Sequence, residues 1–316
     1  MTYRRLETRE GDRFYREAGA GEPVVFLHCS SGSSGAWAPV MEHLAPGYRL
    51  LAPDLLGYGR NAPWPRKAAL APDGELGVVE ALLDVAGQPV HLVGHSYGGT
   101  VALSAASRFP RRVASLTLIE PVAFQLLRGA DELDGWREIA ALAEHHLALV
   151  SQGLDAAAAE AFVTYWTGPK AWQRMPDAAR DSAVQSAVKV AAEWLLMFAA
   201  ENDLDAIGGI EAPTLLVCGG RTRRPARRVV EIVCQALPHA RYHEIADAGH
   251  MSPLTHPADV AEAIRRHVGA VNPQRSSAAK LGLPPNSMAA GEIVTTISFL
   301  GDQSEAAAPF TQAVAE

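Results

Sequence analysis

The chain has few cysteines, no long apolar run and no excess of basic residues. Its 316 residues include three cysteines (Cys29, Cys218 and Cys234), an odd number without the spacing of a metal site. We therefore expect free thiols in a reducing cytoplasm and predict no metal ion. The first residues contain no apolar segment of the kind that signals secretion, which also favours a cytoplasmic location.

Charge and hydropathy argue against two further classes of partner. The formal net charge is −7 at pH 7, which gives no reason to expect binding to nucleic acid or to an anionic membrane. No apolar run approaches the roughly 20 residues that span a bilayer. With 48% hydrophobic and 20% charged residues, the chain is long enough for one large α/β domain with an insertion, or for two small domains.

Short apolar runs bounded by turn residues alternate with helical patterns in two parts of the chain. After an expected hairpin at 3–18, strands are predicted at 23–28, 48–52, 90–93, 115–119, 213–218 and 241–245. Helices are predicted at 37–44, 74–87, 226–237 and 257–269. Such alternation indicates parallel crossover units in one sheet.

The alternation stops between residues 123 and 205, where helices are predicted at 136–150, 156–167 and 178–200. We predict an α/β core formed by 1–122 and 206–270, with a helical cap at 123–205. The cap carries four of the six tryptophans, and some of them are expected to line an apolar acyl pocket while cap packing explains most: Trp136, Trp166, Trp172 and Trp194. Residues 271–316 are rich in Ala, Ser, Pro and Gly, and we predict a loosely ordered tail there.

The most informative motif is Gly94-His95-Ser96-Tyr97-Gly98, which has the pattern G-x-S-x-G. It follows the apolar run 90–93 and precedes the small residues of 99–103, so it predicts a strand, a sharp turn and a helix with the serine at the apex. A serine hydroxyl is a poor nucleophile in water. A strained turn can hold it against a base.

A serine nucleophile needs a base and donors for the oxyanion of the tetrahedral intermediate. His250 lies just past the last predicted strand, at the same sheet edge as Ser96, where ligands bind in open α/β sheets. The alternative is a capping or surface histidine. One oxyanion donor is expected to be the backbone N–H of Tyr97, and the other to come from the loop at 28–32, which follows an earlier strand.

Together, these segments make the chain resemble the α/β-hydrolase superfamily, in its capped branch of esterase-like and C–C-hydrolase-like enzymes. The matching pieces span 3–269: Leu27-His28 with Trp37, Pro53-Asp54-Leu55-Leu56-Gly57-Tyr58-Gly59, Gly94–Gly99, Pro213–Gly220 and Gly249-His250. The resemblance implies the α/β-hydrolase fold, a mostly parallel eight-stranded sheet with helices on both faces and an inserted helical cap.

The resemblance also implies that Ser30, two residues after the loop histidine, supplies the other oxyanion N–H. The family usually has a His-Gly pair in this loop, whereas this chain has His28-Cys29. For Cys29, a small apolar filler is favoured over a reactive thiol. Asp54 is expected to order its own loop, with Tyr58 or Trp64 near the entrance.

The acid of the triad is absent from its usual place. The resemblance implies an aspartate after the strand at 214–218, but this chain continues with Gly219-Gly220-Arg221-Thr222-Arg223. Glu120 ends the preceding core strand, where one group of haloalkane dehalogenases carries its triad acid. We therefore predict Glu120 as the acid, the alternative being a loop carboxylate that caps or pairs with an arginine. Asp247 is interpreted as a turn residue.

Five arginines lie between residues 221 and 228. Their guanidinium groups match carboxylate and phosphate, so recognition of an anionic substrate is one interpretation. A solvated loop and helix face is the simpler one, because Arg227 and Arg228 lie on a helix whose other face is apolar.

The sequence predicts a serine hydrolase that cleaves a carboxylic ester or a related acyl bond through a Ser96–His250–Glu120 triad and an acyl-enzyme. No cofactor is predicted, the substrate is expected to be a small apolar acyl or ester compound, and monomer and homodimer remain open. Hydrolysis of a C–C bond of the meta-cleavage product type is the alternative among enzymes. A non-catalytic ligand receptor is the alternative of another class. Ser96 excludes the dehalogenase and epoxide hydrolase reactions that need an aspartate nucleophile.

Overall fold

The computed structural model describes residues 1–271 except 10, 72, 130–132, 201–203 and 238. The last described helix, α12, ends at Val271. The tail predicted at 271–316 therefore lies outside the described residues, apart from Val271 itself.

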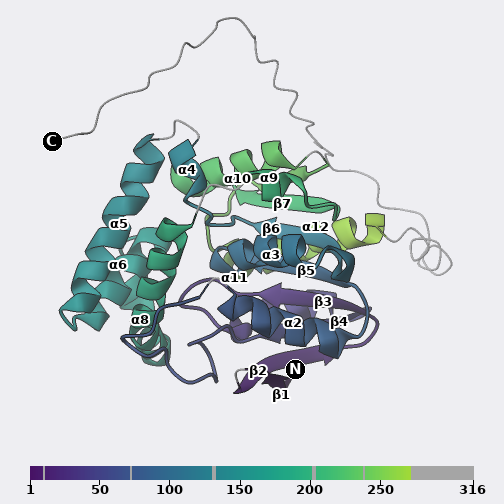
Figure 1. Cartoon of the computed structure of the whole chain (residues 1–316), viewed down its shortest axis with the longest axis horizontal. Helices are drawn as coiled ribbons and strands as arrows, with labels where there is room; N and C mark the ends of the chain where they lie inside the picture. Colours follow the sequence, from purple (N-terminus) through teal and green to yellow (C-terminus); the bar gives the residue numbers. More distant parts are fainter. Residues whose placement is uncertain (10, 72, 130–132, 201–203, 238, 272–316) are drawn as a thin grey trace, which may run out of the picture.

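One eight-stranded sheet forms the centre of the molecule (Figure 1). Its order is β1-β2-β4-β3-β5-β6-β7-β8, in which β1–β2 and β2–β4 pair antiparallel and all other neighbours pair parallel. The strands are β1 (Thr2–Thr8), β2 (Gly11–Gly19), β3 (Glu22–Leu27), β4 (Tyr48–Pro53), β5 (Val90–His95), β6 (Val113–Ile119), β7 (Thr214–Gly219) and β8 (Arg241–Ile245). The mostly parallel eight-stranded sheet that the sequence predicts is confirmed.

Both faces of the sheet are buried, which is why its central strands are continuous apolar runs. On β3, Val24 and Phe26 belong to one core cluster and Val25 and Leu27 to the other. Successive side chains of a strand point to opposite faces, so the two clusters lie on opposite sides of the sheet.

Helices from different parts of the chain cover the two faces. The helices α2, α3 and α10 contribute to the cluster that contains Val25, and α1 and α12 to the cluster that contains Val24. The bounds are α1 (Ala38–Leu44), α2 (Gly74–Ala86), α3 (Tyr97–Arg108), α10 (Arg224–Ala236) and α12 (Pro257–Val271), with short helices η1 (Ser34–Trp37), η2 (Pro110–Arg112) and α11 (Ser252–Thr255).

The segment between β6 and β7 is helical, as predicted. Its helices, called the cap helices below, are α4 (Leu126–Gly129), α5 (Leu133–Ser151), α6 (Asp155–Thr167), α7 (Ala171–Arg174), α8 (Asp177–Ala199) and α9 (Leu204–Gly208). The long helices α5, α6 and α8 pack on one another beside the sheet (Figure 1). The division into a core and a separate cap domain stays a prediction.

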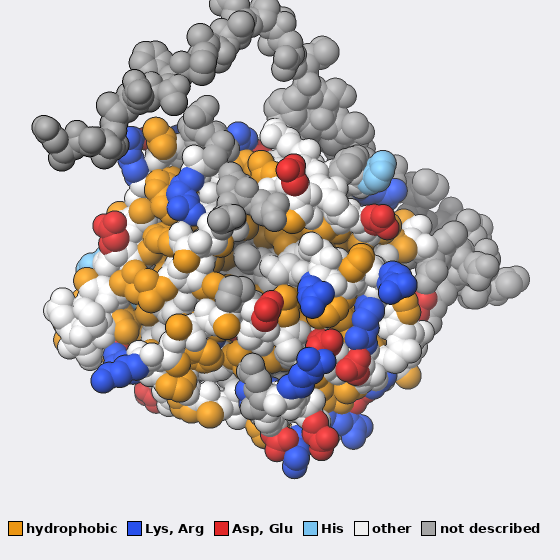
Figure 2. Space-filling model, in the orientation of Figure 1, with side chains coloured by type: hydrophobic (Ala, Val, Ile, Leu, Met, Phe, Trp, Pro, Cys, Tyr) orange, Lys and Arg blue, Asp and Glu red, His pale blue; other side chains and the backbone are white. Residues whose placement is uncertain are grey.

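The distribution of surface charge and the hydropathy of the helices both concern possible binding partners. Acidic and basic side chains are interspersed over the lower right of the face in Figure 2, so the coloured residues there form no block of one sign. Among the residues described, no helix is both long and apolar enough to cross a membrane.

Candidate active site

The turn that carries Ser96 is strained. Ser96 joins β5 to α3 with φ 55° and ψ −120°, a backbone conformation that residues other than glycine rarely adopt. Its N–H donates to the carbonyl of Ile119 at 2.9 Å. A Cβ atom at Gly94 would lie 2.3 Å from the carbonyl oxygen of Gly98, and one at Gly98 would lie 2.3 Å from that of Leu27. The flanking glycines are therefore required by close backbone approach.

A chain of hydrogen bonds joins three of the predicted residues. The distance is 2.9 Å between Ser96 Oγ and His250 Nε2, and 2.7 Å between His250 Nδ1 and Glu120 Oε2. Their exposed fractions are 5% for Ser96, 4% for His250 and 0% for Glu120. Ser96 follows β5, Glu120 follows β6, and His250 lies beyond β8. Because these strands run parallel, all three residues meet at the carboxyl edge of the sheet.

The surroundings of Glu120 favour its carboxylate form. Burial alone would raise its pKa, but the hydrogen bond and charge of His250, together with two further donors, hold the pKa below its usual value. These donors are the backbone N–H of Gly219, at 2.7 Å from Oε1, and the hydroxyl of Thr222, at 2.5 Å from Oε2. Glu120 itself has a φ of 45°. A carboxylate at Oε2 can only accept, so His250 Nδ1 carries a proton and Nε2 is free to accept one from Ser96.

Two aromatic residues contact His250, one at its backbone and one at its imidazole. His95 Nε2 donates to the backbone carbonyl of His250 at 2.8 Å. Burial lowers the pKa of His95 to about 3, so this histidine is neutral. The indole of Trp166, from cap helix α6, stacks on the imidazole of His250 with ring centroids 3.9 Å apart and planes at 26°. A cap residue thus contacts the predicted base directly.

The predicted oxyanion donors lie in two segments that pack on each other. Tyr97 is the first residue of α3, and the close approach of Gly98 to Leu27 sets this helix against the end of β3, where the loop with Ser30 begins. His28 fixes that loop, because its Nε2 accepts from the N–H of Leu55 at 3.0 Å and its Nδ1 donates to the carbonyl of the next residue at 2.8 Å.

Cys29 occupies the place where the family usually has glycine. It is buried, and burial raises the pKa of its thiol to about 12. A thiol that stays protonated at neutral pH is a poor nucleophile. The side chain therefore fills space in the loop, as expected from the sequence.

The arginines at 221–228 bind protein groups. Arg221 pairs with Asp247 at 2.5 Å, and Arg227 pairs with Glu244 at 2.8 Å. Arg223 donates to the backbone carbonyl of Tyr165, at 2.7 Å, and so links the core to cap helix α6. These contacts favour the interpretation as loop and helix-face residues over recognition of an anionic substrate.

A buried ion cluster lies beside the predicted oxyanion loop. Lys189 of α8 donates to Glu193 of the same helix and to Glu75 of α2, and all three side chains are buried. Sequence reasoning missed this cluster. Lys189 and Glu193 stand four residues apart in an apolar stretch of α8, which was the available signal, whereas nothing marked Glu75 as their partner.

The loop after β4 is organised as expected at Asp54. Its carboxylate accepts from the N–H of Ser34 at 2.8 Å and from that of Arg60 at 3.0 Å. Of the two residues expected near the entrance, Tyr58 is buried at 3% exposure and its hydroxyl donates to Glu193. Trp64 is half-buried, and its indole N–H donates to the carbonyl of Ala68.

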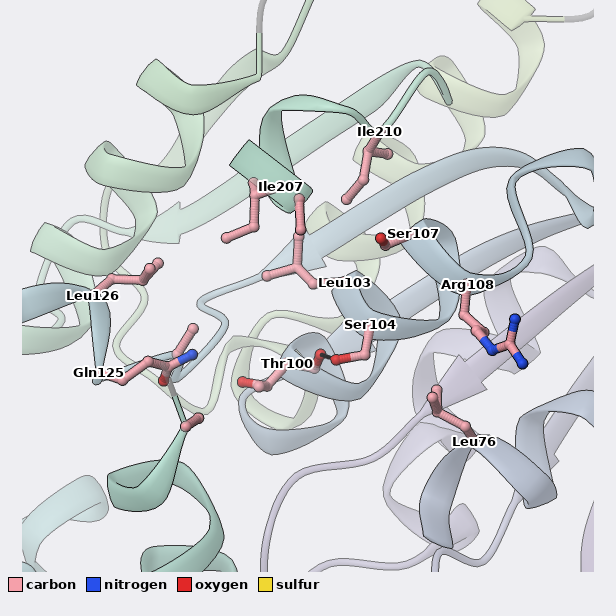
Figure 3. Close-up of a pocket in the computed structure, with 13 residues that line it drawn as sticks. Leu76, Thr100, Leu103, Ser104, Ser107, Arg108, Gln125, Leu126, Ile207 and Ile210 are labelled. Atoms are coloured by element: carbon pink, nitrogen blue, oxygen red, sulfur yellow. Dashed lines mark hydrogen bonds between the residues drawn. The ribbon is translucent and has the colours of Figure 1, made fainter. Parts of the chain in front are cut away.

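A cavity of about 460 Å³ lies among α2, α3, α4 and α9. Figure 3 shows Leu76, Leu103, Ser104 and Ile207 around it, and none of the predicted site residues lines it. The cavity is therefore separate from the Ser96–His250–Glu120 site. No group of three or more His, Cys, Asp or Glu residues within the described ranges is arranged to hold a metal ion.

Comparison with known proteins identifies the family. Residues 22–257 match the family model described as the alpha/beta hydrolase fold. The match covers more than half of the chain, so the protein belongs to this family. Its relatives include two lipases and a 2-hydroxymuconate semialdehyde hydrolase.

Three relatives illustrate the range of proteins to which the chain is similar. The chain is 28% identical to the dihydrolipoyllysine-residue acetyltransferase component of the acetoin cleaving system of Cupriavidus necator, over 81% of this chain and 66% of that protein. It is 26% identical to lipase 1 of Psychrobacter immobilis, over 78% of this chain and 77% of the lipase. It is 37% identical to 2-hydroxymuconate semialdehyde hydrolase of Pseudomonas sp., over 38% of this chain and 44% of that enzyme.

Solved structures share the fold. A thermophilic esterase from Thermogutta terrifontis matches with a TM-score of 0.68 at 22% identity, over 86% of this chain and 99% of the esterase. At that level of identity the likeness concerns the fold alone.

Proposed function

We propose that the protein is a serine hydrolase that cleaves a carboxylic ester or a related acyl bond through a Ser96–His250–Glu120 triad. The observation that carries the proposal is the continuous hydrogen-bond chain from Ser96 Oγ through both ring nitrogens of His250 to Glu120 Oε2. This is the arrangement that a weak nucleophile needs, because a base contacts the hydroxyl and a third group orients the base. The lipase relative supports the choice of an acyl bond.

Each group has one role in the proposed reaction. Ser96 Oγ attacks the acyl carbon while His250 Nε2 takes its proton, and Glu120 stabilises the imidazolium that forms. The backbone N–H groups of Ser30 and Tyr97 bind the oxyanion of the tetrahedral intermediate. When the intermediate collapses, His250 gives the proton to the leaving alkoxide, and the acyl group remains on Ser96. Water then attacks the acyl carbon while His250 takes its proton; the bond to Ser96 Oγ breaks, His250 returns the proton to Oγ, and the carboxylic acid leaves.

A second candidate is hydrolysis of a C–C bond next to a carbonyl. It is supported by the relative named 2-hydroxymuconate semialdehyde hydrolase, which is 37% identical over 128 residues. Both reactions would use the same nucleophile, so the two candidates differ in the substrate that the cap admits. Parallel assays of p-nitrophenyl esters and of a 2-hydroxy-6-oxo-dienoate would separate them through the ratio of the two kcat/KM values.

The nucleophile is tested with a fluorophosphonate probe and a short p-nitrophenyl ester. We expect wild-type protein to be labelled at Ser96, and Ser96→Ala to abolish both labelling and ester hydrolysis. Lack of labelling in well-folded protein would contradict the hydrolase proposal and favour a ligand receptor on the same scaffold.

The acid is tested by Glu120→Gln, which keeps the shape of the side chain. A glutamine offers His250 Nδ1 no carboxylate, so the histidine loses its orientation and its charge partner. We expect turnover to fall by about 10⁴-fold while binding of substrate survives. Turnover close to wild type would remove Glu120 from the triad and leave the role of Ser96 intact.

A further inference from the structure

The buried ion cluster of Lys189, Glu75 and Glu193 joins cap helix α8 to the core. Lys189 Nζ donates to Glu75 Oε1 at 2.9 Å and to Glu193 Oε1 at 2.8 Å. The side chains are 0% exposed for Lys189 and Glu193 and 2% for Glu75. Ions are costly to bury, and an apolar replacement is often more stable, so stability alone does not explain this arrangement.

Both proposed oxyanion residues are attached to this cluster through their side chains. Ser30 Oγ donates to Glu193 Oε2 at 2.5 Å. The Tyr97 hydroxyl donates to Glu75 Oε1 at 3.5 Å, a long and weak bond. Because Lys189 bridges the two carboxylates, a continuous set of contacts runs from one proposed donor residue to the other.

One face of α8 makes these contacts. Ser186, Lys189 and Glu193 are three, four and seven residues apart, a spacing that places them on the same side of a helix. Ser186 Oγ contacts Ser31 Oγ at 3.0 Å, one residue beyond Ser30. The oxyanion loop is thus held by α8 at two successive serines.

The ammonium of Lys189 stays protonated within the cluster. Burial would lower the pKa of Lys189, but the charges and hydrogen bonds of Glu193 and Glu75 outweigh that effect and raise it. The ammonium also lies 4.8 Å from the ring centroid of Tyr97 and 5.2 Å from that of Tyr58, whose hydroxyl donates to Glu193 at 2.7 Å. Cation–π attraction to the Lys189 ammonium therefore also stabilises the position of the Tyr97 ring.

We propose that the cluster of Lys189, Glu75 and Glu193 positions the oxyanion hole, so that the seating of α8 on the core sets the backbone N–H of Ser30 relative to that of Tyr97. The inference rests on the proposed function, which assigns the oxyanion to these two groups. Lys189, Glu75 and Glu193 are positioning residues, because they act through Ser30 and Tyr97. The hole is then complete only with the cap helix in place.

Ser30→Ala is the sharpest variant. It keeps the backbone N–H that would bind the oxyanion and removes only the hydroxyl that contacts Glu193. We expect kcat to fall at least about tenfold with KM within about twofold, because a displaced donor weakens transition-state binding selectively. Tyr97→Phe, which loses only a long hydrogen bond, is expected to cost less than Ser30→Ala.

Two readouts separate positioning from general damage. Affinity for a trifluoromethyl ketone, which forms a tetrahedral adduct with Ser96, is expected to fall in the same proportion as kcat/KM. The double variant with Ser30→Ala and Glu193→Gln is expected to lose no more than the worse single variant, because both changes break the same contact between Ser30 and Glu193. Arg66→Ala is the control. Arg66 lies in the loop between β4 and α2 and forms an exposed ion pair with Asp155 of α6. We expect the loss of this pair to leave kcat unchanged.

The outcomes distinguish this inference from the proposed function. If wild type is labelled at Ser96 but Ser30→Ala and Glu193→Gln change only the melting temperature, or if their losses add, the positioning role is wrong and the hydrolase stands. If wild type is not labelled and hydrolyses nothing, both are wrong. Should Glu193→Gln fail to fold, Ser30→Ala alone decides the question, because it leaves the buried ions intact.

Discussion

At the scale of single residues, Glu120 shows how a carboxylate is held in the folded protein. Gly219, Thr222 and His250 all contact its two oxygens, and together they lower its pKa against the effect of burial. A group with a lowered pKa stabilises the folded state above its unfolded pKa, and that contribution disappears as the pH falls through the folded value.

Glu120→Gln should therefore lower the free energy of unfolding at pH 7 by about 1.5–3 kcal/mol, the range for hydrogen bonds to charged groups. The difference from wild type should persist down to the unfolded pKa of about 4.5 and shrink below it. Urea unfolding of both proteins at several pH values measures this. Asp247→Asn, which breaks an exposed pair with Arg221, serves as the control with a small change. A difference that stays constant to pH 3 would contradict the ionised state of Glu120.

Trp166 offers a second test at this scale. Its indole stacks on His250, so it should stabilise the imidazolium that forms during turnover by about 0.5–2 kcal/mol. We expect Trp166→Leu to lower kcat by roughly twofold to thirtyfold, measured by ester hydrolysis at saturating substrate. Trp136→Leu is the matched control, because Trp136 is a cap tryptophan that packs on Phe198 instead. Equal losses in the two variants would point to cap stability alone.

At the scale of elements, α6 is fastened to the core next to the site. Arg223 donates to the carbonyl of Tyr165, lies 4.1 Å from the ring centroid of Tyr165, and pairs with Glu138 of α5 at 3.5 Å. Tyr165 directly precedes Trp166. A residue from the loop after β7 thus contacts the immediate neighbour of Trp166.

We expect Arg223→Ala to lower kcat/KM by about twofold to fivefold, because a partly exposed ion pair is worth up to about 1 kcal/mol. Amide hydrogen exchange near the end of α6 should increase in the same variant. Arg266→Ala is the comparison, since Arg266 pairs with Glu262 within α12. Unchanged exchange in α6 would show that Arg223 does not hold this helix.

The same scale shows what the sequence predicts and what it does not. The strands and most long helices were predicted because turn residues and apolar runs are local signals, and the fold followed from the matching segments spread over residues 3–269. Glu120 was predicted mainly because the segment after β7 lacks a carboxylate, and because Glu120 ends a neighbouring core strand. Contacts between the cap and the core were not predicted. Lys189 and Glu75, for example, are 114 residues apart, and their meeting depends on how α8 packs on α2.

At the scale of the whole molecule, several buried histidines make the fold sensitive to acid. Burial lowers the pKa of His28 and His146, that of His95 to about 3 and that of His267 to about 4. The unfolded chain takes up protons near pH 6.5 while the folded protein does not, so stability is lost as the pH falls below that value.

The free energy of unfolding should be nearly constant from pH 8 to 7 and fall below about pH 6.5, by about 1.4 kcal/mol per pH unit for each of these histidines. Urea titrations between pH 8 and 4.5 test this. The glutamine of His267→Gln can still donate to the carbonyl of Pro213. This variant should lower the slope of the free energy of unfolding against pH by the contribution of one histidine. A flat profile from pH 7 to 5 would contradict the neutral burial of these side chains.

Thr222 links the absent aspartate to the acid that is present. It lies in the segment where the resemblance implied an acid, and its hydroxyl is 2.5 Å from Glu120 Oε2. We expect Thr222→Asp to reduce ester hydrolysis and stability together at pH 7, since two carboxylates at this spacing cannot both ionise. Improved turnover would show that the two acids tolerate each other. Because only one of two carboxylates at this spacing can be ionised, an exchange of one acid position for the other would pass through a protein with an uncharged residue at both positions.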